Sequence, residues 1–277
     1  YTLPVTPSSA LLAVTAEVPQ GSASDAAGNL NADSNQLSVL YDTQAPSATA
    51  TAQAGPTRDT SLSFGIAFSE SVTGLTTGGF AVSNGIAGSL TGSGSNYTLV
   101  VTPTGQGAVT VQVNAAAAQD TAGNGNTASN VASVTFDSVN PDVTVSAVSI
   151  TNASPILFAI EFSEPVSGLD ASSVSVTNGV KGILSGSGTS YTLPVTPIAQ
   201  GNVTLQVQAA GAVDGAGNSN NASNTASALY DSIAPTCIVT SAAGAITNVS
   251  PVQFTLSFSE NVTGLSAADL VVTGGAK

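Results

Sequence analysis

The sequence predicts an all-β protein in which β-sandwich modules of about 95 residues follow one another in an extended tandem array. Three observations support this prediction. Short acidic phrases recur along the chain at a nearly constant interval, apolar and polar residues alternate with a period of two, and no segment has the apolar period of a helix. Together they indicate one β-sheet unit that is copied several times in line.

Three phrases define the length of the repeat. The tripeptide FSE ends at Glu70, Glu164 and Glu260. The phrase D-x-A-G-N begins at Asp25, Asp120 and Asp214. The third phrase is an aromatic residue followed by Asp, with Pro four residues after the Asp, and its aspartates are Asp42, Asp137 and Asp231. Successive members of each series lie 94 to 96 residues apart, so the whole chain is one periodic array.

This period divides the chain into four units. Residues 43–137 and 138–231 each form a complete module. Residues 1–42 correspond to the last three strands of a module, E to G, and residues 232–277 correspond to its first three, A to C. Because Tyr1 falls in the middle of a repeat, we expect the chain to be a window of a longer array.

Within residues 43–137 the apolar pattern predicts about seven short strands. The first clear strand has apolar residues at every second position from Leu62 to Phe68. Further strands are predicted at Phe80–Val82, around Leu90, and at 97–102, 109–113 and 134–136. Seven short strands with Gly, Pro and Asn turns in such a length favour an immunoglobulin-like sandwich.

Two prolines qualify the strand at 97–102. Pro4 and Pro194 occupy its equivalents in other repeats. Proline has no N–H to donate to a sheet, so this strand should be unpaired on one side at that point.

Several strings in fixed order resemble a known family. FSEPVSGLDASSVSVTNG, LSGSGTSYTLPVTP, DGAGN and YDSIAP are similar to the bacterial Ig-like repeats of large cell-surface and adhesin-type proteins, over the whole chain. The resemblance implies a structural spacer in an extracellular or cell-surface protein, with further copies of the repeat, in the same or neighbouring chains, as its partners. Two alternatives stay open: a subunit of a polymerised filament such as a flagellar hair, whose partial modules are completed by flanking or neighbouring chain, and a ligand-binding adhesin module.

The acidic phrases are expected to meet where modules join. In a seven-strand sandwich the end of strand B, the F–G loop and the entry from the preceding module share one pole. We therefore expect three carboxylate groups to form there: Asp42 with Glu70 and Asp120, Asp137 with Glu164 and Asp214, and Asp231 with Glu260. Oxygen-only ligand sets suit Ca²⁺, and the D-x-A-G-N asparagines, Asn124 and Asn218, are candidate oxygen donors. The same residues are also ordinary in turns and at strand ends.

Composition excludes several function classes. Charged residues are 7% of the chain, the net charge is −13, and the only cations are Arg58, Lys181 and Lys277. Nucleic acids and anionic membranes are therefore excluded as partners, since both require clustered Lys and Arg. We find no apolar run that would insert in a membrane.

Catalysis is not expected. The chain has no His, and its one cysteine, Cys237, is predicted in a first strand as a small buried apolar residue rather than a cross-link between chains. A hydrolytic carboxylate pair needs a cleft between the two acids, whereas every repeated acid lies at a module pole.

Six N-x-S/T sequons also occur. About that many arise by chance in a chain so rich in Ser and Thr, so they identify glycans only as a further partner to be tested. Their asparagines are Asn96, Asn152, Asn202, Asn221, Asn248 and Asn261.

Overall fold

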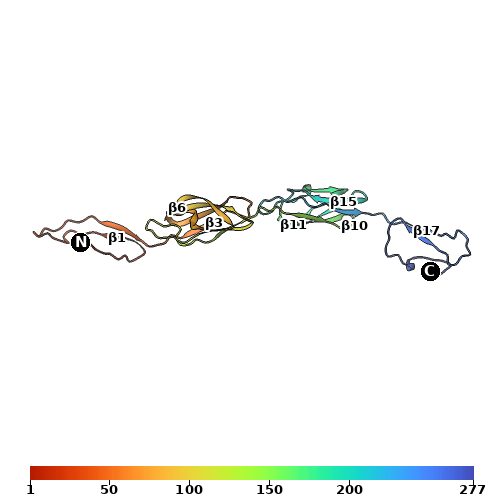
Figure 1. The fold of residues 1–277 in the computed structure, drawn as a ribbon, viewed down its shortest axis with the longest axis horizontal. Helices are drawn as coiled ribbons and strands as arrows, with labels where there is room; N and C mark the ends of the chain where they lie inside the picture. Colours follow the sequence, from red (N-terminus) through yellow and green to blue (C-terminus); the bar gives the residue numbers. More distant parts are fainter.

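The computed structural model describes all residues from Tyr1 to Lys277 as four β-units arranged in a line, with the termini at opposite ends (Figure 1). The two central units are compact, and each terminal unit holds one two-stranded sheet. Helical structure is limited to three short 3₁₀ turns: η1 (Thr77–Gly79), η2 (Ala171–Ser173) and η3 (Ala267–Asp269). No helix is long and apolar enough to cross a membrane.

The first complete module is a sandwich of two three-stranded sheets. One sheet has the order β3-β4-β6 and the other β5-β7-β8, with antiparallel pairing throughout. Their bounds are β3 (Ala48–Ala52), β4 (Leu62–Val72), β5 (Phe80–Ser83), β6 (Gly85–Pro103), β7 (Gly107–Val113) and β8 (Ala132–Phe136). The prediction of an immunoglobulin-like sandwich is confirmed.

The second module repeats this plan with four strands in each sheet. The sheet orders are β13-β14-β11-β9 and β10-β16-β15-β12. The short strand β10 pairs with β16 in parallel, whereas the other pairs are antiparallel. The strands are β9 (Val143–Ser146), β10 (Ile150–Thr151), β11 (Ile156–Val166), β12 (Val174–Thr177), β13 (Gly179–Lys181), β14 (Ser185–Pro197), β15 (Gly201–Val207) and β16 (Ala226–Tyr230).

Each module has its own core, built from the period-two residues. Strands β4 and β11 show the same alternation of buried and exposed positions along all eleven residues. Phe64 and Phe158 are completely buried at equivalent places, and each core unites 16 or 17 buried residues of its own module. Burying one such side chain contributes about 1.5–3 kcal/mol to the free energy of unfolding. Each complete module is therefore stabilised by its own core.

The ends of β4 and β11 differ from the prediction. We expected the FSE phrase to end strand B at Glu70 and Glu164, but β4 continues to Val72 and β11 to Val166. The pairing register shifts between Ala67 and Val72, and again in the second module, which is the signature of a bulge. A bulge lets the strand bend and keep its pairing, which pure alternation does not reveal.

Pro194 acts as predicted. It pairs with Leu157 of β11 on one side. On the other side its carbonyl accepts a 2.7 Å hydrogen bond from the N–H of Gly182, but β13 has ended at Lys181. In the first module Val100 stands at this position and the strand segment β6 is uninterrupted. The missing N–H of proline therefore interrupts the ladder on one side only.

The terminal units are less regular than expected. Only β1 (Leu11–Ala16) with β2 (Leu37–Asp42), and β17 (Cys237–Thr240) with β18 (Thr255–Phe258), form sheets. The strands expected at the outermost positions are absent, because the sheets they would pair with belong to the other half of a module. For the same reason Cys237 is exposed, and the prediction that it is buried was wrong.

Candidate metal centre

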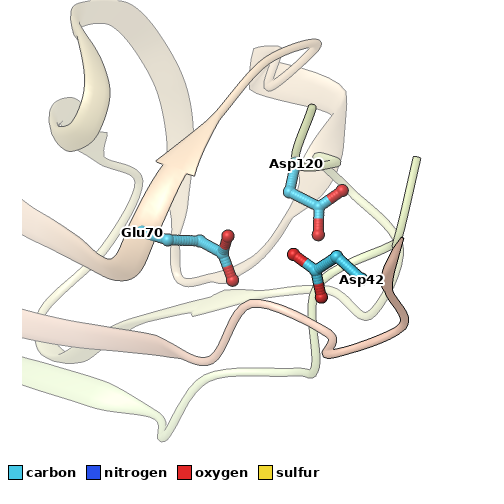
Figure 2. Close-up of side chains that lie close together, drawn as sticks. All are labelled: Asp42, Glu70 and Asp120. Carbon is cyan, nitrogen blue, oxygen red and sulfur yellow. The ribbon is translucent and has the colours of Figure 1, made fainter. Parts of the chain in front are cut away.

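Two clusters of three carboxylates lie at the joints of the array. The first carboxylate cluster consists of Asp42, Glu70 and Asp120, whose side chains point toward one another (Figure 2). The second carboxylate cluster consists of Asp137, Glu164 and Asp214. In each cluster one oxygen from every residue lies within 4.8 Å of the others. The structure thus brings together two groups that the repeat phrases associate.

The alternation of side chains along strand β11 directs Glu164 toward the joint between the modules. In β11, Glu164 lies on the same parity as Phe162 and Val166, which are both buried. Its side chain therefore lies on the core-facing side of the strand, at the end of the module where the core stops. Tyr191 supports this end of the strand, since its hydroxyl donates a 3.1 Å hydrogen bond to the carbonyl of Val166. Glu70 has the same relation to Phe68 and Val72 in β4.

The D-x-A-G-N loop fixes the second carboxylate. Asp214 is buried, and its Oδ1 accepts hydrogen bonds from the main-chain N–H groups of Ala216 and Asn218, both at 2.8 Å. The Asn218 amide donates to its Oδ2 at 2.9 Å. Burial acts to raise the pKa of Asp214, but these hydrogen bonds together hold it below the usual value of 3.8. Asp214 is therefore ionised at neutral pH.

Asp120 in the first module has the same environment. It is also buried, and Asn124 donates to it through its main-chain N–H at 2.9 Å and its amide at 2.8 Å. Burial opposes ionisation, yet the hydrogen bonds lower the pKa of Asp120.

The third carboxylate comes from the linker. Asp137 directly follows β8 of the first module, and its Oδ1 accepts a 3.0 Å hydrogen bond from the N–H of Val139. Asp42 follows the same pattern at the end of β2, with the N–H of Gln44 at 2.8 Å. This local turn holds the linker carboxylate at the joint.

Desolvation and charge repulsion in the second carboxylate cluster act on Glu164. Desolvation raises its pKa above the usual 4.5, and the negative charges of Asp137 and Asp214 raise it further. Desolvation, then Asp120 and Asp42, raise the pKa of Glu70 in the same way. No lysine or arginine offsets either effect. Each joint therefore accumulates negative charge that the protein itself does not neutralise.

The oxygen spacing fits a calcium ion. Ca²⁺ binds oxygens at about 2.3–2.6 Å, so two oxygens on one ion lie at most about 5.2 Å apart. The 4.8 Å limit within each cluster satisfies that condition. A divalent cation would also supply the missing counter-charge. Three carboxylates leave further ligand positions for water or main-chain carbonyls.

The two predicted asparagine ligands contact the clusters through their amide nitrogens. The side-chain nitrogen of Asn124 donates to Asp120 and to the carbonyl of Asp42, and that of Asn218 donates to Asp214 and to the carbonyl of Asp137. These amides position carboxylates through their nitrogen atoms. The motif suggests these asparagines as oxygen donors, but it does not reveal which end of the amide faces the cluster.

The third expected group is incomplete. Asp231 and Glu260 line one pocket of about 410 Å³, together with Asn152 and Asn261 among others. This pocket lies between the second module and the terminal unit that contains β17 and β18. The D-x-A-G-N residue that would complete this group is not part of the chain.

The asparagines of all six sequons are exposed. Asn221 already uses its side chain, which donates a 2.7 Å hydrogen bond to Asp142. Exposure meets the steric requirement for glycan attachment.

Comparison with known proteins decides the family. A model of the bacterial Ig-like domain matches the chain twice in succession, over residues 42–136 and 137–230. The chain belongs to the bacterial Ig-like domain family. These matched ranges begin and end one residue before our module boundaries. No curated protein matches the sequence.

The chain is also similar to parts of solved structures, among them three bacterial proteins. Invasin, a bacterial integrin-binding protein, is 17% identical with a TM-score of 0.37, over 65% of this chain and 41% of its own. The adhesin InvE of Yersinia pseudotuberculosis is 14% identical, with a TM-score of 0.26 over 66% and 58%. The C-terminal domain of the Streptococcus agalactiae AgI/II polypeptide BspA is 12% identical, with a TM-score of 0.29 over 66% and 99%. The chain thus spans less than two thirds of the length of invasin and of InvE.

Proposed function

We propose that this chain is a structural spacer of an extracellular or cell-surface protein, in which Ca²⁺ stiffens the joints between Ig-like modules. The observation that carries the proposal is the recurrence of one three-carboxylate cluster at two successive joints, without a neutralising cation. A cluster that served only one turn would have no reason to draw each of its acids from a different structural element. Here the three acids come from the linker, a strand end and a loop.

Several further features support a passive spacer. The modules at residues 43–137 and 138–231 share one order of strands, to which the second adds the short strands β10 and β13, and β4 and β11 have the same burial pattern. A linear array of this kind derives its properties from each module and its nearest neighbours. The family and the charge-poor surface rich in Ser and Thr suit an extracellular setting. We assign no catalytic role to any residue.

Thermal unfolding of the full chain tests the calcium step. We expect CaCl₂ to raise the melting temperature and EGTA to reverse the shift, while MgCl₂ has a smaller effect because Mg²⁺ requires oxygens within about 4.2 Å of one another. The substitutions Glu70→Gln and Glu164→Gln together should abolish the shift. Glu161→Gln is the matched control, since Glu161 lies in the same strand as Glu164 but outside the cluster. An unchanged melting temperature in Ca²⁺ would refute the metal-stiffened joint.

A second candidate function, the filament subunit, would use the exposed apolar surfaces of the terminal units. Leu3, Val39 and Phe254 are 79%, 58% and 60% exposed. Their equivalents in the complete modules, Leu99, Val134 and Phe158, are 0%, 3% and 0% exposed. Such apolar surface is normally covered, and in a filament the complementary half of a module from a neighbouring chain would cover it.

Sedimentation of the chain over a wide concentration range separates the two functions. Assembly into long particles at increasing concentration supports the filament, and negative-stain images should then show continuous fibres. A monomer of constant sedimentation coefficient supports the spacer and excludes completion by neighbouring copies.

A further inference from the structure

The linker between modules lies against the loop that contains D-x-A-G-N in the following module. At the second joint the side-chain nitrogen of Asn218 donates a 3.0 Å hydrogen bond to the carbonyl of Asp137. Three residues further along the same loop, the N–H of Asn221 donates to the carbonyl of Pro141 at 2.9 Å. The linker is therefore held at two carbonyls, four residues apart.

The first joint repeats this contact with the same spacing. Asn124 donates to the carbonyl of Asp42 at 3.2 Å, and the N–H of Thr127 donates to the carbonyl of Pro46 at 2.9 Å. Of the eight donor and acceptor residues at the two joints, six belong to the repeat phrases and two lie three residues after D-x-A-G-N. The recurrence excludes a chance contact at one joint.

The chemistry of its acceptors fixes the orientation of the Asn218 amide. Its nitrogen faces the ionised carboxylate of Asp214 and the carbonyl of Asp137, neither of which has a proton to donate. Only the NH₂ end of the amide satisfies both acceptors. Asn218 is 3% exposed, so water does not replace either contact readily.

The linker residue is also bonded to the module before it. The N–H of Asp137 donates a 2.9 Å hydrogen bond to the carbonyl of Thr57 in the first module. One residue therefore joins both modules, with its N–H bonded backward and its carbonyl bonded forward. The modules also approach closely here, since a Cβ built on Gly215 would lie 3.4 Å from Cγ of Pro56.

We propose that Asn124 and Asn218 lock the linker onto the following module and fix the orientation of consecutive modules without any bound ion. The proposal rests on the spacer function, which requires a stiff joint, but it does not depend on calcium. The asparagine of D-x-A-G-N is a positioning residue that acts between modules. The turn chemistry of the motif by itself would need only contacts within its own loop.

Distance measurements between spin labels on the full chain test this lock. Labels at Ser93→Cys and Ser187→Cys, in a Cys237→Ser background, report the geometry between the first and second modules, because both serines are exposed. The protein is kept in EDTA, so that no divalent ion contributes. The variants are Asn218→Ala and the near-isosteric Asn218→Leu, which keeps the branched shape, loses the donor and adds no charge to the carboxylate cluster.

Asn224→Ala is the matched control. Asn224 also makes two hydrogen bonds, at 2.8 and 2.9 Å, but both join it to Val145 within the second module. We expect both Asn218 variants to broaden the distance distribution, with the open joint gaining roughly fivefold in population, the effect of one neutral hydrogen bond. Asn224→Ala should lower the melting temperature of the module and leave the distribution narrow.

Two results would overturn the lock: an unchanged distribution in both Asn218 variants, or equal broadening in Asn224→Ala. A final measurement in CaCl₂ separates the lock from the proposed function. If Ca²⁺ narrows none of the distributions and raises no melting temperature, the calcium-stiffened spacer fails, whereas broadening by Asn218→Ala in EDTA still establishes the lock.

Discussion

Replacing Glu164 by Gln removes one negative charge from the second carboxylate cluster and keeps the size of the side chain. At 4.8 Å, the upper limit of the oxygen separations in the cluster, two unit charges repel by about 0.9 kcal/mol in water. Ionic screening at physiological salt, with a Debye length of about 8 Å, reduces this to about 0.5 kcal/mol for each pair. Glu164 faces two aspartates, so Glu164→Gln should stabilise the metal-free second module by about 1 kcal/mol.

Differential scanning calorimetry of the full chain in EDTA measures this gain. For a domain of this size 1 kcal/mol corresponds to about 4–8 °C in melting temperature. In CaCl₂ the order should reverse, because the wild-type cluster gains an ion that the variant holds poorly. Glu161→Gln, whose carboxylate accepts a 2.6 Å hydrogen bond from Ser190 outside the cluster, should show neither effect. A lower melting temperature for Glu164→Gln in EDTA would refute the repulsion on which the metal centre rests.

Three more predictions follow from the structure. The pKa of Glu164 is raised above 4.5, so the stability that its protonated form contributes is complete below pH 4.5 and is lost as the pH rises through the raised pKa. In a pH series in EDTA the melting temperature should therefore fall over that interval. The increase in melting temperature on adding Ca²⁺ should grow over the same interval. Phe158→Ala should destabilise the second module by about 3–5 kcal/mol in urea unfolding, since the ring is completely buried. Pro194→Val should restore one N–H donor toward Gly182 and stabilise the module by about 0.5–1.5 kcal/mol; unchanged hydrogen exchange at Gly182 and its neighbours would contradict this.

The repeat made most of the fold predictable. Period-two alternation at Leu62–Phe68 identifies a strand with one buried face, and its copy at 156–162 shows that the same strand recurs. Turn residues divide the remaining strands, and the number of strands in each period indicates a sandwich. These features are local, and local chemistry is what a sequence displays directly.

Predictions failed where a residue depends on distant partners. Cys237 has the sequence environment of a buried strand residue, but its unit lacks the opposing sheet, so the thiol is exposed. Glu70 looks like the end of a strand, yet a bulge carries β4 on to Val72. Neither pairing nor burial is a property of the residue alone.

For the joints, the sequence by itself determined which acids recur together. In a periodic array every contact between neighbouring modules is repeated, so acids that recur with the same spacing along the chain also recur together at each joint. Only the tertiary structure decided how they meet. It directs Glu164 into the joint through strand parity, and it turns the amide nitrogen of Asn218 toward the carbonyl of Asp137. The physical reason is that hydrogen-bond direction depends on where the acceptors lie, and these acceptors belong to segments 81 and 4 residues away.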